Sequence, residues 1–310
     1  MLAIQSQTAC SPTRITCLGE ALVDLICERP LERLAQADAF VPRFGGAVAN
    51  VAVTAARTGA RVALAGGAGD DSWGRWLRDR LAREGVELSL FGLVGGSQTP
   101  IAIVGVAAGG EPRYRIYGET IATVVHALAD RLEDAIRGSA ALFFSTNTLV
   151  SERERKLTMR ARELALALDR PVIFDPNLRL HRWASTAHAS RAANACVPGA
   201  LLVRTNEAEA ALMTGERDPE RAARALLQAG ARMVVITLGA GGAMLRGELR
   251  ADAPGAQARV ISTVGAGDAL TGVLLGRLGL ARFDPSAVAA SLPEAVAESA
   301  RACERWGALD

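Results

Sequence analysis

The sequence predicts an α/β fold, in which short apolar strands alternate with helices around a sheet. Over most of the chain, apolar runs of strand length are separated by segments with the residue pattern of helices. Between about 87 and 118, three strand-like segments instead follow one another without a helix, which indicates a small antiparallel lid over a site. A chain of 310 residues, 50% of them hydrophobic, suits one large α/β domain or two smaller ones.

In chain order, the predicted strands are apolar or β-branched runs bounded by turn residues. They span 15–18, 21–26, 61–65, 87–94, 99–107, 113–117, 141–144, 171–174, 201–204, 233–238, 244–249 and 258–262. Helices are predicted at 72–84, 127–137, 151–168 and 293–306, and behind the glycine turns described below. Ser151 and Glu154 have the spacing of a capping box at the start of one helix. Residues up to about Pro12 are expected to form a loose tail.

Composition and motif content argue against several classes of function. The formal net charge of +2 favours neither nucleic acid nor an acidic partner. Lys156 is the only lysine and follows no Gly-x-x-x-x-Gly run, so the chain has no P-loop. The Gly-x-Gly-x-x-Gly fingerprint of dinucleotide binding is also absent from the sequence.

Cysteine usage and hydropathy indicate a cytoplasmic protein without a membrane span. The cysteines are scattered and odd in number, and none forms a Cys-x-x-Cys pair, which argues against zinc and disulfide frameworks. They are Cys10, Cys17, Cys27, Cys196 and Cys303. The sequence has no run of about 18 apolar residues, and its first residues lack the pattern of a signal peptide, so we expect neither feature.

The turn Gly265-Ala266-Gly267-Asp268 precedes a segment whose apolar residues recur with helical spacing. Such a turn presents backbone N–H groups at the positive end of a helix dipole, which favours an anion. Asp268 would repel a resting phosphate, so we interpret it as a base that takes a proton while the amides hold the transferring group. The alternative, of equal weight from this stretch alone, is a tight turn whose Asp complements the dipole.

A second glycine turn, Gly45-Gly46, leads to Asn50 at the start of a helix that stops near Gly59. Asp24 stands inside an apolar run, and a buried carboxylate there would need a partner. It forms a salt bridge, faces solvent, or accepts hydrogen bonds from the hydroxyls of a ligand.

Polar residues follow three predicted strands at their carboxyl ends, where open α/β sheets bind ligands. The segments are Asp-Pro-Asn-Leu-Arg at 175–179, Thr-Asn-Glu-Ala-Glu at 205–209 and Thr-Leu-Gly-Ala-Gly-Gly at 237–242. The spacing of Asn206 and Glu209 places both on one face of a helix start. Without further context, they are equally an N-cap and a carboxylate that complements the helix dipole.

These motifs, in this order, resemble those of the ribokinase-like (PfkB) carbohydrate kinases, and Asp-Pro-Asn-Leu-Arg followed by Trp183 is similar to the fructokinase-like branch. The resemblance covers nearly the whole chain. It implies one kinase domain over 13–310, with a doubly wound, mostly parallel sheet flanked by helices and a small β-strand lid from about 28–44 and 87–118. Many members pair through the lid, which implies a possible homodimer.

The resemblance also implies a role for each matching residue. Sugar hydroxyls would be bound by Asp24, Gly45, Gly46, Asn50, Asn177 and Arg179. ATP and Mg²⁺ would be bound by Asn206, Glu209, Thr237, Gly239 and Gly242. Glu209 would be the metal ligand. Asp268 would deprotonate the sugar hydroxyl while the amides of Gly265, Ala266 and Gly267 steady the developing charge.

Three positions depart from the family pattern. Ser262 stands where relatives usually have an Asp tied to a monovalent-cation site. The resemblance therefore implies K⁺ as a possible cofactor, and Ser262 argues against it. Val48 replaces a Pro that is frequent in fructokinase-like members. Gly118 stands where several sugar kinases place an Arg on the lid.

The sequence thus predicts an ATP-dependent kinase that transfers the γ-phosphate to a primary hydroxyl of a free sugar, fructose first. Within the family, the alternatives are a 2-keto-3-deoxygluconate kinase, whose acidic substrate needs an Arg such as Arg115 or Arg179, and a ribokinase or nucleoside kinase. From another class, a ligand-binding protein without turnover is permitted by Ser262 and opposed by Asp268. A nicotinamide-dependent dehydrogenase is disfavoured by the missing fingerprint.

Overall fold

The structure is a computed structural model, and it describes residues 13–117, 121, 125 and 128–309. The tail expected up to Pro12, and Gly118 of the expected lid, lie outside the described residues.

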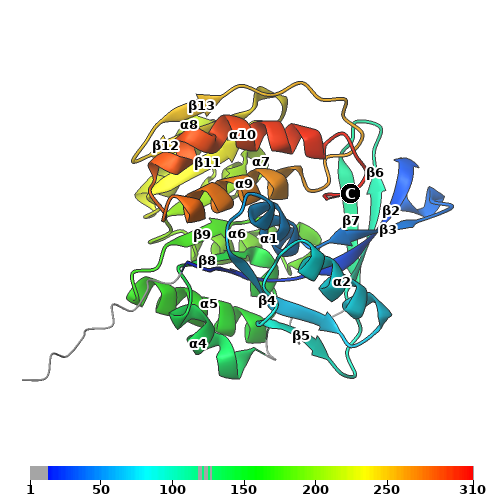
Figure 1. The fold of residues 1–310 in the computed structure, drawn as a ribbon. Coiled ribbons are helices and arrows are strands. Elements are labelled where there is room, and N and C mark those ends of the chain that lie inside the picture. Colours follow the sequence, from blue (N-terminus) through cyan, green and yellow to red (C-terminus); the bar gives the residue numbers. More distant parts are fainter. Residues whose placement is uncertain (1–12, 118–120, 122–124, 126–127, 310) are drawn as a thin grey trace, which may run out of the picture.

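A large central sheet of nine strands is built from these residues (Figure 1). Its strands are β1 Ile15–Leu18, β4 Val62–Gly69, β5 Phe91–Val94, β8 Ala141–Ser145, β9 Val172–Asp175, β10 Leu202–Asn206, β11 Met233–Thr237, β12 Ala243–Gly247 and β13 Ala251–Ala253. Their order is β13-β12-β11-β10-β9-β8-β1-β4-β5. All neighbouring strands from β11 to β5 pair in parallel, whereas the pairs β11–β12 and β12–β13 are antiparallel. This arrangement confirms the mostly parallel sheet.

Helices cover both faces of this sheet, as a doubly wound fold requires (Figure 1). One face packs against α1 Ala47–Arg57, α2 Ser72–Arg83, α9 Ala266–Leu280 and α10 Ser286–Ala302. The other packs against α4 Leu132–Arg137, α5 Glu152–Ala167, α6 Thr186–Asn194, α7 Glu207–Thr214 and α8 Pro219–Gln228. Side chains of one strand alternate between these two cores: Phe143 of β8 lies in the first and Phe144 in the second.

A second sheet of four strands forms the lid among the described residues. It has the order β3-β2-β6-β7, with bounds β2 Leu22–Pro30, β3 Val41–Gly45, β6 Ile101–Val106 and β7 Pro112–Tyr117. The prediction that 87–94 joins this excursion is wrong, because β5 pairs in parallel with β4 at the edge of the large sheet. The apolar face of the small sheet packs on Val264, directly before the Gly265 turn, so the lid lies over the start of α9.

Short 3-10 helices occur at Leu34–Gln36, Ala129–Arg131, Thr146–Leu149, Leu180–Arg182 and Gly239–Gly241. The expected strand at 258–262 does not form; the N–H groups of Ile261 and Ser262 instead donate to the carbonyl of Cys303 at the end of α10. The last helix begins earlier than predicted, because Pro293 lies inside α10 and not in its first turn. No helix in the described part of the chain is long and apolar enough to cross a bilayer.

Two glycines of α9 allow this helix to pack very closely on α1. A Cβ at Gly272 would lie 2.4 Å from the Cβ of Thr54, and one at Gly276 would lie 2.1 Å from the Oγ1 of Thr58. Because real Cβ atoms do not approach this closely, larger residues would force the two helices apart. The close packing of α9 on α1 sets the separation of the residues at their N-terminal ends, where Asn50 and Asp268 lie.

Candidate active site

Asp268 lies in the first turn of α9 and is almost fully buried, at 6% exposure. Gly265 is the N-cap of this helix and has a left-handed backbone with φ 76°. Among the described residues, no acceptor takes the N–H groups of Gly265, Gly267 or Asp268. The turn therefore presents free donors beside a carboxylate, as the interpretation of an anion-holding base requires.

Two amides hold the Asp268 carboxylate in place. Asn50 of α1 donates its Nδ2 to Oδ2 of Asp268 at 2.9 Å, and Asn177, after β9, donates its Nδ2 to Oδ1 at 3.1 Å. The side-chain oxygens of both amides lack a partner in the described structure. These two hydrogen bonds orient the Asp268 carboxylate, and each of its oxygens keeps a lone pair that can accept from a hydroxyl.

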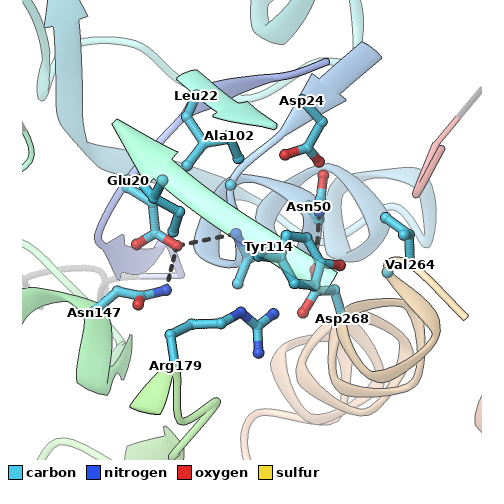
Figure 2. A pocket seen from close by; sticks show the side chains of 14 residues that line it. Glu20, Leu22, Asp24, Asn50, Ala102, Tyr114, Asn147, Arg179, Val264 and Asp268 are labelled. Carbon is cyan, nitrogen blue, oxygen red and sulfur yellow. Dashed lines mark hydrogen bonds between the residues drawn. The ribbon is translucent and has the colours of Figure 1, made fainter. Parts of the chain in front are cut away.

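Asp268 faces a small cavity between the lid and the N-terminal ends of α1 and α9 (Figure 2). Its lining residues are Glu20, Leu22, Asp24, Gly46, Ala47, Asn50, Ala102, Tyr114, Ile116, Asn147, Arg179, Val264, Gly265 and Asp268. Polar groups from the large sheet, the lid and both helices therefore converge on one space.

Burial raises the pKa values of two acids of this cavity, Asp268 and Asp24. Desolvation raises the pKa of Asp268 to about 6, although the hydrogen bond from Asn50 and the charge of Arg179 oppose the rise. Desolvation, together with the charge of Asp268, raises the pKa of Asp24 to about 8. Asp268 is thus ionised and Asp24 largely protonated at pH 7, which suits one base and one hydrogen-bonding partner.

Arg179 supplies the cation of the cavity. Its guanidinium lies 4.7 Å from the ring centroid of Tyr114 on the lid, a cation–π contact that couples the large sheet to the lid. Glu20 lies across the cavity in Figure 2, where its Oε1 accepts from Asn147 Nδ2 and from the N–H of Ala47, while its Oε2 has no partner in the described structure. Glu20 therefore anchors the start of the helix that carries Asn50.

Replacement of Asp24 by Asn is expected to stabilise the protein above neutral pH. The pKa of this group rises from 3.8 to about 8 on folding, so the folded state binds the proton more tightly than the unfolded chain. Stability conferred by the wild-type residue therefore falls as pH rises from 3.8 towards 8. We expect Asp24→Asn to raise the unfolding free energy at pH 8 by about 1 kcal/mol or more. Denaturant melts at pH 8 and pH 5 test this, and an equal change at both values would contradict it.

A second, larger and open cleft lies on the other side of the α9 turn. Its lining includes Arg204, Asn206, Thr237, Gly239, Gly242, Ala266 and Gly267, with residues of the 255–263 loop and of α10. Gly239 and Gly242 have left-handed φ values of 55° and 94°, and a Cβ at Gly242 would lie 2.1 Å from the carbonyl oxygen of Ala253. Glycine is therefore required where this loop turns at the cleft.

Glu209 is buried and lines neither cavity. Its Oε1 accepts from the N–H of Leu178, and its Oε2 accepts from the N–H of Asn206, whose side chain caps α7 in return. No cluster of three or more potential metal-binding side chains occurs among the described residues. In this structure, both oxygens of Glu209 thus serve backbone N–H groups, and neither faces a cavity.

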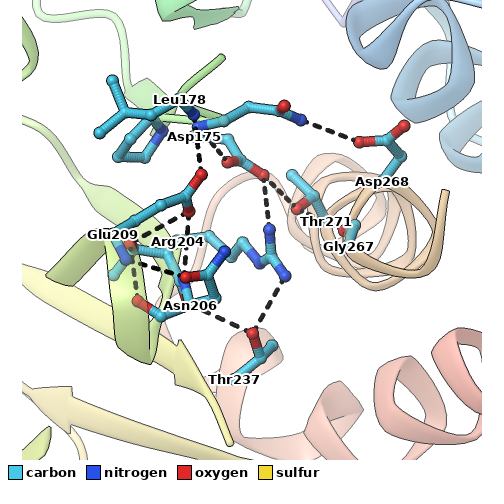
Figure 3. A network of polar contacts seen from close by, with 12 residues as sticks. Asp175, Leu178, Arg204, Asn206, Glu209, Thr237, Gly267, Asp268 and Thr271 are labelled. Atoms are coloured by element: carbon cyan, nitrogen blue, oxygen red, sulfur yellow. Dashed lines mark hydrogen bonds and ion pairs between the residues drawn. The ribbon is translucent and has the colours of Figure 1, made fainter. Parts of the chain in front are cut away.

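A polar network joins the two cavities (Figure 3). Asp175, at the end of β9, accepts hydrogen bonds from Arg204 Nη1 at 3.2 Å and from Thr271 of α9 at 2.8 Å. Arg204 also donates from Nη2 to Oγ1 of Thr237 at 3.1 Å. The carboxyl ends of β9, β10 and β11 are thereby tied to α9, next to the base.

The structure brings most of the predicted site residues to these two spaces. The sugar-binding candidates Asp24, Gly46, Asn50 and Arg179 line the small cavity with Gly265 and Asp268. Gly45 lies behind the side chain of Asp24 and does not line the cavity. A Cβ at Gly45 would lie 2.4 Å from the carboxyl carbon of Asp24. Sequence reasoning missed Glu20, Asn147 and Arg204. The positions of Glu20 and Asn147 just after the ends of β1 and β8 are the signal that could have found these two residues, whereas Arg204 lies inside β10 and has no such signal.

Comparison with known proteins gives one consistent family. The model of the pfkB family carbohydrate kinases matches residues 12–303. Fructokinase-1 of Oryza sativa subsp. japonica is 31% identical, over 85% of this chain and 82% of its own.

Two solved structures extend the likeness. A fructokinase double mutant from Vibrio cholerae O395, in a form with fructose, ADP and potassium bound, is 28% identical with a TM-score of 0.83, and the match covers 96% of this chain and 94% of that one. An aminoimidazole riboside kinase from Salmonella enterica, complexed with aminoimidazole riboside and an ATP analogue, is 25% identical with a TM-score of 0.80, over 96% and 95% of the two chains. With nearly its whole length matched, this chain belongs to the pfkB family of carbohydrate kinases.

Proposed function

We propose that this protein is an ATP-dependent kinase that phosphorylates a primary hydroxyl of a free sugar, with fructose as its first substrate. The observation that carries the proposal is the placement of Asp268, which Asn50 and Asn177 hold in the turn between the small polar cavity and the open cleft. The proteins that match most of this chain include fructokinases of plants and bacteria.

In the proposed mechanism, Asp268 takes the proton of the sugar hydroxyl. The hydroxyl oxygen forms a bond to the γ-phosphorus of ATP, and the bond from that phosphorus to the β,γ-bridging oxygen breaks, with its electron pair leaving on ADP. The free N–H groups of the Gly265 turn stabilise the charge on the transferring group. Asn50 and Asn177 keep the carboxylate aligned with its target.

The pH dependence of the reaction should report the ionisation of Asp268. Because only the carboxylate accepts a proton and its pKa is raised to about 6, kcat/KM should fall about tenfold per pH unit below pH 6 and level off above it. Initial rates between pH 4.5 and 8 at subsaturating sugar measure this profile. A profile that stays flat down to pH 5 would assign the proton transfer to another group.

The cavity favours a neutral sugar over a sugar acid. It contains three carboxyl groups, from Glu20, Asp24 and Asp268, against the guanidinium of Arg179. Arg115, the other arginine considered for an acidic substrate, is exposed on β7 and is absent from the lining, whereas its neighbours Tyr114 and Ile116 are part of it. The carboxylate of 2-keto-3-deoxygluconate would therefore have one cation to pair with in this lining, Arg179, which already stacks on Tyr114. The riboside-bound relative keeps a riboside as the second candidate substrate.

Several finer features remain predictions. Mg²⁺ would accompany the nucleotide, and a requirement for K⁺ is not expected, since Ser262 is fully buried and its hydroxyl already accepts from the N–H of Val264. A homodimer through the lid is supported by large apolar side chains exposed there, such as Val41 and Tyr117. A cytoplasmic location fits the free thiols of Cys17, Cys27, Cys196 and Cys303.

A sugar panel in a coupled ATP-consumption assay, with and without K⁺, tests the proposal. We expect kcat/KM for fructose to exceed that for ribose, aminoimidazole riboside and 2-keto-3-deoxygluconate by about tenfold or more. A riboside or a sugar acid as the best substrate would replace fructose and leave the kinase activity in place. Absence of ATP consumption with every sugar would favour a binding protein without turnover.

A further inference from the structure

Arg204 is a buried cation that sequence reasoning did not assign to the reaction. It lies in the middle of β10, is 5% exposed and lines the open cleft beside Thr237 and Gly267. Burial of a charged group is costly unless the group is paired or meets a ligand of opposite charge.

The hydrogen bonds of Arg204 leave its guanidinium only partly satisfied. Nη1 donates to Asp175 and Nη2 to Thr237, while Nε has no partner in the described structure (Figure 3). A guanidinium carries five N–H groups, so donors remain beyond these two bonds. Asp175 is shared with Thr271, which weakens its hold on any one partner. These contacts hold the guanidinium in place and leave some of its N–H donors available to a ligand.

The guanidinium also packs against the turn that carries the base. A Cβ at Gly267 would lie 2.7 Å from Nη1 and 2.8 Å from Nη2 of Arg204. Gly267 is therefore small because an arginine lies against it, one residue before Asp268. Burial raises the pKa of Asp268, and the positive charge of Arg204 opposes this rise.

We propose that Arg204 is a catalytic residue that binds the γ-phosphoryl group of ATP and stabilises its charge during transfer. The proposal rests on the kinase function proposed above, because that reaction requires the γ-phosphoryl group to reach the Gly265–Asp268 turn. Arg204 neither gives nor takes a proton. Its charge acts while the new bond to the sugar oxygen forms and the bond to the β,γ-bridging oxygen breaks, with the electron pair leaving on ADP.

A purely structural ion pair is the competing explanation, and Arg246 provides the matched control. Arg246 is 8% exposed and pairs with Glu220 and Asp252, but it lies on β12 and lines neither cavity. If buried arginines serve only to hold strands together here, Arg204→Gln and Arg246→Gln should lower thermal stability and leave nucleotide binding and turnover alone.

The test measures turnover, nucleotide affinity and melting temperature for Arg204→Gln, Arg204→Lys and Arg246→Gln. We expect Arg204→Gln to lower kcat by about 10²-fold and Arg204→Lys by about tenfold, because lysine keeps the charge and loses the planar fork. By calorimetry, Arg204→Gln should weaken a non-hydrolysable ATP analogue by about tenfold and AMP by less than about twofold.

Should Arg204→Gln fail to fold, Arg204→Lys decides the question, because lysine keeps the charge and loses the planar fork. Unchanged turnover and analogue affinity in folded Arg204→Gln, or in Arg204→Lys where only this variant folds, overturn the proposal while the kinase function stands. If the wild type phosphorylates no sugar, the proposed function fails, and selective loss of the triphosphate analogue still supports Arg204 as a phosphate-binding residue. A wild type that does not bind the analogue overturns both.

Discussion

Replacement of Asp268 by Asn is expected to lower kcat by about 10²-fold or more while the protein stays folded. An amide cannot accept the proton of the sugar hydroxyl, so the step assigned to this residue loses its base. The fold should tolerate the change, because Asn50 and Asn177 both have unpartnered side-chain oxygens and can rotate their amides to accept from the new donor. Steady-state kinetics and thermal melts of the purified variant measure the two effects.

Asp218→Asn is the matched control for this experiment. Asp218 caps α8 by accepting from the N–H of Arg221, far from both cavities, and Asn is an equally good cap. It should leave turnover and stability unchanged. If Asp268→Asn keeps near-normal turnover, Asp268 is not the base. If it loses turnover only together with the fold, the chemistry must be read from Asp268→Ser instead.

Much of the fold could be predicted because its strands are short apolar runs with polar residues at their carboxyl ends. The segments after β9, β10 and β11 were identified this way, and they do converge on one edge of the sheet. The error at 87–94 has a physical cause: an edge strand is half exposed, and its pattern does not say which sheet completes its hydrogen bonds. That information lies in a long-range pairing with β4.

The site was less predictable than the fold, because contacts between distant segments decide it. Glu209 has the spacing of both a cap and a ligand, and only the structure shows its oxygens taken by Leu178 and Asn206. Arg204 could not be singled out while the neighbours of β10 were unknown. From the sequence, Gly272 and Gly276 are only small residues in a helix. The structure shows that glycine is needed there because α1 packs directly against them.

Replacement of Gly265 by Ala is expected to lower kcat/KM by about 10²-fold, because it moves the donors that stabilise the transferring group. Gly265 has φ 76°, and a Cβ there would lie 2.2 Å from the Cβ of Ala308, near the buried C-terminal end. The alanine variant therefore meets both backbone strain and a clash. Since Ala308 is packed in the core, the turn has to shift, and its free N–H groups shift with it.

Gly85 allows the strain to be separated from the clash. It has the same φ of 76°, but a Cβ there would meet nothing within 4 Å. Gly85→Ala should therefore lose about 1 kcal/mol of stability from the left-handed backbone alone and keep wild-type kinetics. Gly265→Ala should lose more stability and, unlike the control, its turnover. Measured side by side, equal kinetics in the two variants would mean that the amides of the Gly265 turn do not hold the transferring group.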